Sequence, residues 1–358
     1  MSPAVAHPPG KTKDARFSTN LIRWQRSHGR HTLPWQNTRD AYRIWLSEIM
    51  LQQTQVGTVI PYFERFLARF PDVLSLAAAP QQDVMALWSG LGYYSRARNL
   101  HRCAQRIVAD YAGTFPSNPR LLAELPGIGR STAAAIAIFS AGMRAAILDG
   151  NVKRVLCRAF GLEGYPGDKA VETKLWAKAE SLLPKQNLEA YTQGLMDLGA
   201  TVCTRGQPNC AACPLARQCV ALTTGRVSEL PQPRPKKPTP EKQLAMLVIV
   251  DNDEVLLLRR PDYGIWGGLW SLPEVEDNDQ TAIRQAAERF GEITDCQPLA
   301  EFTHTFTHFR LRVLPWLIHL RQRKPIAAQQ EQVWQNLDQM AQAPLPAPVR
   351  KLLEKISA

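Results

Sequence analysis

The sequence contains no run of about 18 consecutive apolar residues, which is the length that a helix needs to cross a membrane. The opening stretch, MSPAVAHPPGKTKDARF, has no apolar core of the kind found in secretory signals. An internal repeat is also absent. Hydrophobic residues nevertheless make up 45% of the 358 positions, so two or three ordinary globular domains can form. We therefore expect a cytoplasmic protein, associated with the nucleoid if it binds bacterial DNA, and no membrane partner.

Acidic residues are fewer than basic ones. Lys and Arg number 43 against 32 Asp and Glu, which gives a net charge of +11. Between residues 91 and 160 there are ten basic residues and only three acidic ones, so this segment alone carries +7. A localised basic face favours a polyanionic partner, most simply nucleic acid.

Cysteines are few, and their distribution is uneven. Four of the seven fall within one short segment, with the spacing Cys203-x6-Cys210-x2-Cys213-x5-Cys219. In a reducing compartment such clustering indicates metal binding, not disulfides. Zinc and an iron–sulfur cluster both remain open, although a single Cys-x2-Cys beside Pro214 suits a [4Fe–4S] cluster better. The other three are expected to be core thiols: Cys103, Cys157 and Cys296.

The pattern along the chain predicts two regions of different class. Residues 1–225 are mostly helical, residues 226–240 form a proline-rich linker, and residues 241–358 form an α+β domain. Within the last region, DND separates two strand-like runs and predicts a hairpin turn.

One carboxylate stands out in the helical region. The stretch WLSEIMLQQTQV (45–56) reads as one amphipathic helix, on which Glu48 shares a face with Ile44, Trp45 and Leu51. A carboxyl group in apolar surroundings holds its proton more strongly, as a general acid near neutral pH must. The alternative is a partly exposed residue paired with Arg43 or an amide.

Two further features point to an anionic ligand and a second carboxylate. The turn LPGIGRSTAAAI places Gly127 and Gly129 before a helix, where backbone amides can bind an anion, although a plain helix-turn-helix connection is the simpler alternative. In AAILDGNVKRVL, Asp149 ends an apolar run and precedes a basic helix. It is either an ordinary helix N-cap or a carboxylate at the mouth of that helix.

Five ordered motifs resemble a known superfamily over roughly residues 20–222. They are LSEIMLQQTQV, GLGYYSRARNL, LPGIGRSTA, LDGNVKRV and the cysteine run, and together they resemble the helix-hairpin-helix DNA glycosylases with an iron–sulfur cluster. The resemblance implies two helical lobes, one carrying a [4Fe–4S] cluster. The endonuclease III branch has a lysine nucleophile where this chain has Ser131, so the sequence is more similar to the monofunctional MutY-type branch. That branch removes adenine opposite 8-oxoguanine or guanine by hydrolysis.

The resemblance also implies catalytic roles. Glu48 would protonate adenine N7, Asp149 would stabilise the oxocarbenium-like sugar, and Asn151 would orient the aspartate and a water molecule. Direct hydrolysis and a covalent Asp149 intermediate both remain open.

DNA-contacting positions are implied in the same way. Gln53 and Tyr93 would wedge into the duplex near 8-oxoguanine, and Leu33, Trp35 and Gln193 would surround the flipped adenine. Hairpin residues 127–131, which include Gly127, Gly129 and Ser131, would bind one phosphate. Lys153 and Arg154 would make non-specific phosphate contacts.

The C-terminal region resembles a Nudix fold. Gly268 and Glu274 fit the start of the Nudix box, but AIRQAA (282–287) lacks the acids that bind Mg²⁺, so pyrophosphatase activity is not expected. The resemblance assigns 8-oxoguanine recognition to Phe306, Thr307 and His308. Packing within a strand is the alternative, and a second FTH at 302–304 leaves the register open.

The implied partner is double-stranded DNA with A:8-oxoguanine or A:G mispairs, bound by a monomer. Two alternatives remain: a bifunctional endonuclease III-like glycosylase, and a non-catalytic iron–sulfur protein that binds DNA.

Overall fold

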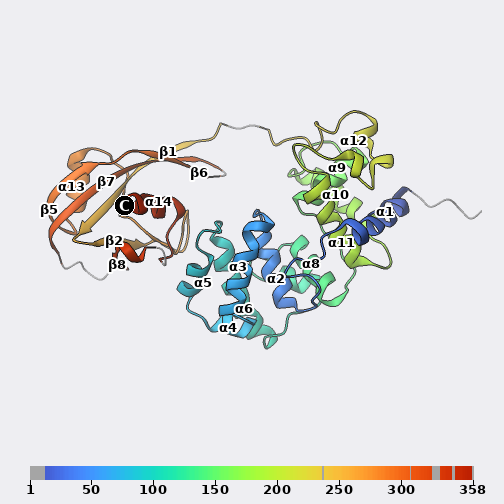
Figure 1. Cartoon of the computed structure of the whole chain (residues 1–358), viewed down its shortest axis with the longest axis horizontal. Helices are drawn as coiled ribbons and strands as arrows, with labels where there is room; N and C mark the ends of the chain where they lie inside the picture. Colours follow the sequence, from blue (N-terminus) through green and yellow to red (C-terminus); the bar gives the residue numbers. More distant parts are fainter. Residues whose placement is uncertain (1–12, 236–237, 307, 325–330, 341–342, 357–358) are drawn as a thin grey trace, which may run out of the picture. The chain divides into compact units, whose positions relative to one another are not determined.

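The computed structural model describes residues 13–235, 238–306, 308–324, 331–340 and 343–356. Within these residues the chain forms two compact units, whose helices and strands are labelled in Figure 1. The first unit contains the described residues up to 77 and those from 102 onward to 235. The second contains residues 78–101 and the described residues after 237.

Helices make up the part of the chain before the linker. Their bounds are α1 Lys13–His28, α2 Ala41–Leu51, α3 Val56–Arg69, α4 Val73–Ala78, α5 Gln81–Trp88, α6 Ser95–Tyr111, α7 Pro119–Ala123, α8 Arg130–Ala141, α9 Gly150–Phe160, α10 Lys169–Ser181, α11 Leu188–Asp197, η1 Leu198–Val202, η2 Cys210–Ala212, η3 Ala216–Gln218 and α12 Val220–Thr223.

The prediction of one helix over residues 45–56 is wrong. Helix α2 ends at Leu51 and α3 begins at Val56, with a turn between them. Within that turn Gln53 has a φ of 59°, in the left-handed region that few residues other than glycine adopt. The apolar pattern continues across the break because both helices bury apolar faces, so hydrophobic periodicity alone could not locate it.

The ends of α8 and α9 follow from their local sequences. Gly142 caps the C-terminus of α8 and Gly161 that of α9, and each glycine has a φ of 66°, as left-handed C-caps require. Asp149 is the N-cap of α9, and its side chain accepts a hydrogen bond from the backbone N–H of Val152. The middle of α8 lies in the core, since six consecutive residues of this helix are buried.

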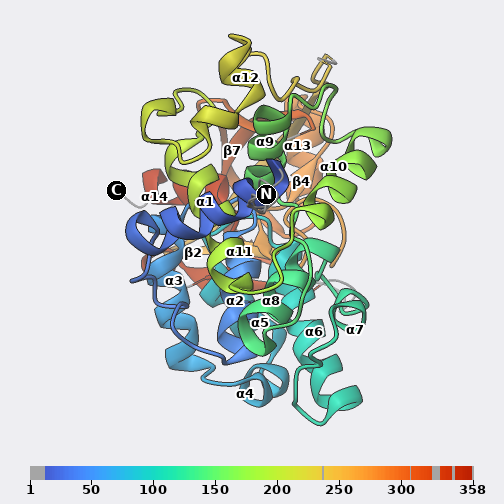
Figure 2. The same ribbon diagram turned by 90° about the vertical axis from the view of Figure 1, so that its right-hand side faces the viewer.

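A core in the first unit joins helices that are distant in sequence. Helix α1 lies beside α11 (Figure 2), and both contribute buried side chains to a cluster that also includes Val152, Leu156 and Leu175. Helix α2 packs against α8 and α3. This packing places the end of α11 and the beginning of α9 in one part of the unit, and those two segments carry the candidate site.

The second unit contains a mixed sheet with the order β3-β2-β1-β7-β5. Strands β4, β6 and β8 pair with β1, β7 and β2 respectively. The bounds are β1 Glu241–Asp251, β2 Glu254–Arg259, β3 Trp270–Ser271, β4 Glu274–Val275, α13 Gln280–Ala287, β5 Gly291–Pro298, β6 Phe302–Thr305, β7 Arg310–Arg323, β8 Gln332–Asn336, η4 Leu337–Gln339 and α14 Ala347–Ile356.

The predicted hairpin turn at DND is confirmed. Asp251 and Glu254 are paired across β1 and β2, so Asn252 and Asp253 form the turn, and Asn252 has a φ of 52°. Helix α13 packs against β1 and β5, as the expected α+β class requires (Figure 1). Residues 78–101 join this unit through contacts such as the hydrogen bond from Tyr94 Oη to the carbonyl oxygen of Leu345, at 3.4 Å.

Among the residues that the structure describes, none of the helices is both long and apolar enough for a membrane span.

Candidate functional site

The first unit contains a cavity of about 1910 Å³. Its walls come from the loop between α1 and α2, from α2 and the turn after it, from the beginnings of α8 and α9, and from α11. Small-molecule pockets usually occupy about 300–1,000 Å³, so this cavity can admit a segment of a larger ligand. Both Glu48 and Asp149 line it.

Glu48 has a strongly raised pKa. Its side chain faces the cavity from α2, and the surrounding protein raises the pKa of its carboxyl from 4.5 to about 8, mainly through desolvation and secondly through the charge of Asp149. Arg43, the partner considered in the alternative interpretation, pairs instead with Asp40, at 3.9 Å. A carboxyl with this pKa is mostly protonated at neutral pH and can donate that proton.

Asp149 has surroundings of a different kind. Its Oδ1 accepts a hydrogen bond from the backbone N–H of Val152 at 2.8 Å. Burial raises the pKa of its carboxyl, whereas hydrogen bonds from the N–H groups of Val152 and Asn151 and the charges of Arg154 and Lys153 oppose the rise. Asp149 is therefore an N-cap and a cavity-lining carboxyl group at once, so the two interpretations of this residue are compatible.

Asn151 is held by the half-buried side chain of Arg154. Its Oδ1 accepts from Arg154 Nη2 at 2.7 Å, and the same guanidinium donates to the carbonyl oxygens of Cys203 and Gly199, also at 2.7 Å. The backbone at Gly199 approaches Asn151 so closely that a Cβ at position 199 would lie 2.5 Å from Asn151 Cβ. Arg154 is half-buried and also lines the cavity, so it holds Asn151 at the cavity wall, and its phosphate contact stays a prediction. Lys153 pairs with Glu172, at 2.6 Å.

Ser131 connects the hairpin to the catalytic segment. Its hydroxyl oxygen accepts a hydrogen bond from the backbone N–H of Leu148 at 2.9 Å, directly before Asp149. The side chain also lines the cavity. A serine here has no amine that could form a Schiff base.

The positions expected to surround a base also line the cavity. Leu33, Trp35 and Gln193 are all half-buried there. The ring of Trp35 packs edge-on against Phe63, with 5.4 Å between centroids. Gln36 closes the loop that carries Leu33, because it accepts from the N–H of Leu33 at 3.1 Å and donates to the carbonyl oxygen of Arg30 at 2.9 Å.

Both expected wedge residues have unusual backbone conformations. Gln53 lines the cavity with an exposed side chain and a φ of 59°. Tyr93, which belongs to the second unit, has a φ of 50° and a side chain that is 46% exposed. Left-handed conformations in non-glycine residues cost energy and occur often at ligand-binding positions.

The hairpin before α8 presents open backbone. Gly127 has a φ of 78°, and Gly129 is the N-cap of α8. Both glycines are exposed, and a Cβ at position 129 would meet no atom within 4 Å. The first N–H groups of a helix have no partner within the helix and can bind an anion. The exposed turn at Gly127 and Gly129, followed by the N-terminus of α8, therefore suits a phosphate.

Cys203, Cys210, Cys213 and Cys219 are unbridged and half-buried. Burial raises the pKa of the Cys213 thiol to about 11, and the charges of the other three thiols add to the rise. Arg158, only 4% exposed, donates to Cys203 Sγ at 3.4 Å and to the carbonyl oxygens of Thr204 and Leu230 at 2.7 and 2.8 Å. Within the described residues, no group of three or more Cys, His, Asp or Glu side chains meets the geometry of a metal-ion site.

In the second unit, aromatic rings gather beside the expected recognition loop. The Phe306 ring lies 5.4 Å from Trp266, 4.6 Å from His304 and 4.6 Å from Phe309, measured between centroids. His308 is exposed, and Thr307 lies outside the described residues. Glu274, the acid of the Nudix box that this sequence retains, forms an ion pair with Arg260, which compensates its charge.

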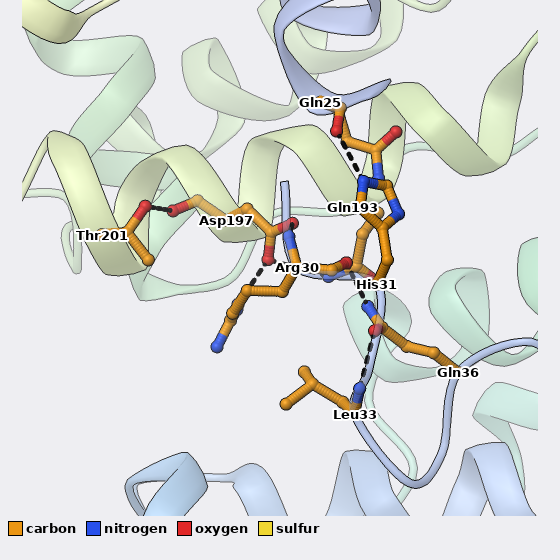
Figure 3. A network of polar contacts seen from close by, with 8 residues as sticks. All are labelled: Gln25, Arg30, His31, Leu33, Gln36, Gln193, Asp197 and Thr201. Atoms are coloured by element: carbon orange, nitrogen blue, oxygen red, sulfur yellow. Dashed lines mark hydrogen bonds and ion pairs between the residues drawn. The ribbon is translucent and has the colours of Figure 1, made fainter. Parts of the chain in front are cut away.

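The sequence analysis missed Asp197. This residue is fully buried and hydrogen-bonded to Arg30 and Gln193, both of which line the cavity (Figure 3). The signal that could have found it is the one that identified Glu48: a lone acid in the apolar helical stretch GLMDLGA.

Family models match both regions of the chain. Residues 46–181 match the HhH-GPD superfamily of base excision DNA repair proteins, and residues 245–355 match the NUDIX domain.

Curated relatives match nearly the whole chain. An adenine DNA glycosylase of Buchnera aphidicola subsp. Acyrthosiphon pisum is 39% identical, with 94% of this chain and 97% of that protein covered. The adenine DNA glycosylase of Homo sapiens is 32% identical, with 87% and 68% covered.

Solved structures share the helical fold. A thermostable thymine-DNA glycosylase has a TM-score of 0.53 at 28% identity, and 59% of this chain and 97% of that chain are covered. A non-covalent endonuclease III–DNA complex has a TM-score of 0.50 at 20% identity, with 60% and 99% covered, and this similarity concerns the fold alone.

Proposed function

The chain belongs to the family of adenine DNA glycosylases, enzymes of base-excision repair, and from this premise we propose how it selects and removes adenine. The substrate is adenine opposite 8-oxoguanine or guanine in double-stranded DNA, and the reaction is hydrolysis of the N-glycosidic bond without strand cleavage. The observation that carries the proposal is the pair of unlike carboxylates, Glu48 and Asp149, in one cavity.

Glu48 acts as the general acid. Adenine is a poor leaving group until N7 is protonated, and a carboxyl with a pKa of about 8 still holds its proton at neutral pH. Buried apolar neighbours one turn away on α2, Ile44 and Trp45, contribute to the apolar surroundings in which desolvation raises this pKa.

Asp149 stabilises the positive charge that develops on the sugar as the C1′–N9 bond breaks. Burial raises the pKa of Asp149, but two backbone N–H donors and the neighbouring cations oppose this rise and favour the ionised form that stabilises the sugar. Asn151, held by Arg154, orients Asp149 or the attacking water. The reaction then ends by direct addition of water or through a covalent Asp149 intermediate.

The wider DNA interface uses both units. Gly127, Gly129 and Ser131 bind a phosphate beyond the lesion, and Leu33, Trp35 and Gln193 enclose the extruded adenine. Gln53 and Tyr93 enter the duplex, and Phe306, Thr307 and His308 recognise 8-oxoguanine. Gln53 and Tyr93 belong to the interface proposed above.

We also propose that residues 1–225 form the catalytic region and residues 241–358 the domain that recognises 8-oxoguanine, joined by the linker 226–240. The protein acts as a monomer on DNA of the bacterial nucleoid.

The four cysteines would hold a [4Fe–4S] cluster. The four thiols lie close enough for their charges to interact, and Arg158 donates to Cys203 Sγ, as expected of ligands around one shared centre. One thiolate per iron places the sulfurs of a cubane site farther apart than those around a single zinc ion. The bound cluster would organise residues 203–219, and no step of base removal passes through it.

Single-turnover release of adenine from duplexes containing A:8-oxoguanine, A:G and A:T tests this function. Wild-type protein should release adenine from the first two, and Glu48→Gln and Asp149→Asn should lose that activity. Release that survives both substitutions would contradict the assignment of acid and anion.

A borohydride trapping assay distinguishes the bifunctional alternative. Since Ser131 has no amine, wild-type protein should form no efficient covalent adduct with DNA. An efficient adduct would favour the endonuclease III-like reaction.

A further inference from the structure

Asp197 is a fully buried carboxylate at the end of α11. Its Oδ2 accepts from the backbone N–H of Arg30 at 2.9 Å, and its Oδ1 accepts from Arg30 Nε at 2.7 Å and from Gln193 Nε2 at 3.0 Å (Figure 3). Both oxygens are therefore satisfied by protein donors. Arg30 supplies two of the three hydrogen bonds and compensates the buried charge.

The contact with Asp197 determines which way the Gln193 amide is turned. A glutamine amide has a donor end and an acceptor end, and an ionised carboxylate can only accept. The Nε2 end of Gln193 must therefore face Asp197, one helical turn away. The Oε1 end accepts no hydrogen bond from any residue in the described part of the chain, and the side chain lines the cavity.

We propose that Asp197 is a positioning residue that sets base specificity by presenting Gln193 as a hydrogen-bond acceptor to the extruded base. This inference rests on the proposed function. Adenine carries an exocyclic amine at C6, which can donate to Gln193 Oε1. Hypoxanthine and guanine carry a carbonyl oxygen at C6, which faces Oε1 as acceptor against acceptor and is rejected.

A neutral side chain at position 197 could not impose this orientation. An asparagine amide would offer either a donor or an acceptor, so Gln193 could turn either end toward the cavity and accommodate both kinds of base. The loop that carries Arg30 also lies very close to Asp197. A Cβ at Gly29 would lie 2.5 Å from the carbonyl oxygen of Gln25 and 3.0 Å from Asp197 Oδ2. Glycine at position 29 thus allows the loop that carries Arg30 to reach the carboxylate.

The test compares single-turnover excision of adenine and of hypoxanthine, each placed opposite 8-oxoguanine. In Asp197→Asn the ratio of the adenine rate to the hypoxanthine rate should fall on the order of tenfold, because a hydrogen bond with a charged partner no longer holds the amide. Gln193→Ala should lower the ratio to a similar extent, and adding Asp197→Asn to it should cause no further fall.

Thr201→Ala is the matched control. The Thr201 hydroxyl donates to the backbone carbonyl oxygen of Asp197 at 2.8 Å, so its loss disturbs the same residue without changing the carboxylate. The control should leave the ratio unchanged. A role of Asp197 in stability alone would lower both rates together, and an unchanged ratio in folded, active Asp197→Asn would overturn the inference. A further fall in the Gln193→Ala background would do the same.

A measurement on the unmodified protein covers the case in which Asp197→Asn does not fold. The side-chain NH₂ resonances of Gln193, assigned by their loss in Gln193→Ala, should exchange slowly with solvent because one proton is held by Asp197. Rapid exchange would contradict the inference. A wild-type protein that releases neither base would contradict the proposed function itself. If the wild type releases adenine but Asp197→Asn leaves the ratio of adenine to hypoxanthine rates unchanged, only the role of Asp197 is contradicted.

Discussion

Glu48 on α2 and Asp149 at the beginning of α9 line one cavity, and the charge of Asp149 helps to raise the pKa of the Glu48 carboxyl to about 8. Desolvation makes the larger contribution to this pKa. Burial raises the pKa of both carboxyls. Backbone hydrogen bonds and neighbouring cations oppose the rise at Asp149, whereas the carboxyl of Glu48 receives no hydrogen bond from the described residues.

The rate of adenine release should fall as the pH rises through about 8, because Glu48 then loses the proton that it donates. Single-turnover rates measured from pH 6 to pH 10 test this. Glu48→Gln should be reduced by several orders of magnitude and show no such fall. A wild-type profile that is flat across pH 8 would exclude Glu48 as the acid.

Glu48→Gln should also change the dependence of stability on pH. Between pH 4.5 and about 8 the unfolded wild-type chain releases a proton that the folded protein retains, so the free energy of unfolding falls over this window and is level above it. The glutamine variant lacks this fall and should be more stable above pH 8, by at most roughly 5 kcal/mol. Urea denaturation at pH 5 and pH 9 measures the difference, and equal stability at pH 9 would contradict the raised pKa.

Asp149→Asn should separate the charge of this residue from its capping role. Asparagine caps helices about as well as aspartate, so α9 should form and the free energy of unfolding should change by no more than about 1 kcal/mol. Adenine release should fall at least on the order of a hundredfold because the positive sugar loses its anion. Asp149→Ala, which removes both, should lose activity and stability together. An active asparagine variant would show that the charge is dispensable.

Gly129→Ala should weaken DNA binding without disturbing the fold. The backbone at this position has a φ of −85°, and a Cβ would meet no protein atom within 4 Å, so alanine is compatible with the folded chain. A phosphate at the exposed N–H groups would, however, contact the added methyl. Affinity for duplex DNA should drop severalfold with the melting temperature unchanged. Gly142→Ala is the comparison, since its φ of 66° predicts lower stability instead.

Replacing Cys213 with serine should remove iron from the purified protein and lower DNA affinity or folding before it affects chemistry. Cys296→Ala, which alters a buried thiol of the second unit, should retain the full iron content. Iron analysis, visible absorption and DNA-binding measurements on both variants make the comparison. Full catalysis by a folded protein without iron would contradict a structural role for the cluster.

Arg158→Met should destabilise the segment that carries the four cysteines without removing a thiol. The buried guanidinium donates to Cys203 Sγ and to three backbone carbonyl oxygens, of Thr204, Arg205 and Leu230. Methionine fills comparable space but leaves these acceptors without donors, so the melting temperature should fall by several degrees. Arg158→Lys should recover only part of the loss, because an ammonium group cannot reproduce the planar fork.

Much of this protein could be predicted from local sequence. Helix caps such as Asp149, C-terminal glycines such as Gly161 and the turn at Asn252 depend on short-range backbone chemistry, so the amino acids themselves indicate where those elements begin and end. The break after Leu51 escaped prediction because apolar periodicity continues through it.

The sequence by itself determined the change from helical to strand-rich segments, the cysteine spacing and the presence of an acid on an apolar helix, whereas packing placed residues 78–101 in the second unit. Only the tertiary structure decided that Glu48 shares a cavity with Asp149, that Arg154 turns inward to hold Asn151, and that Asp197 orients Gln193. Desolvation and hydrogen-bond direction depend on neighbours from distant parts of the chain, and packing alone brings those neighbours together.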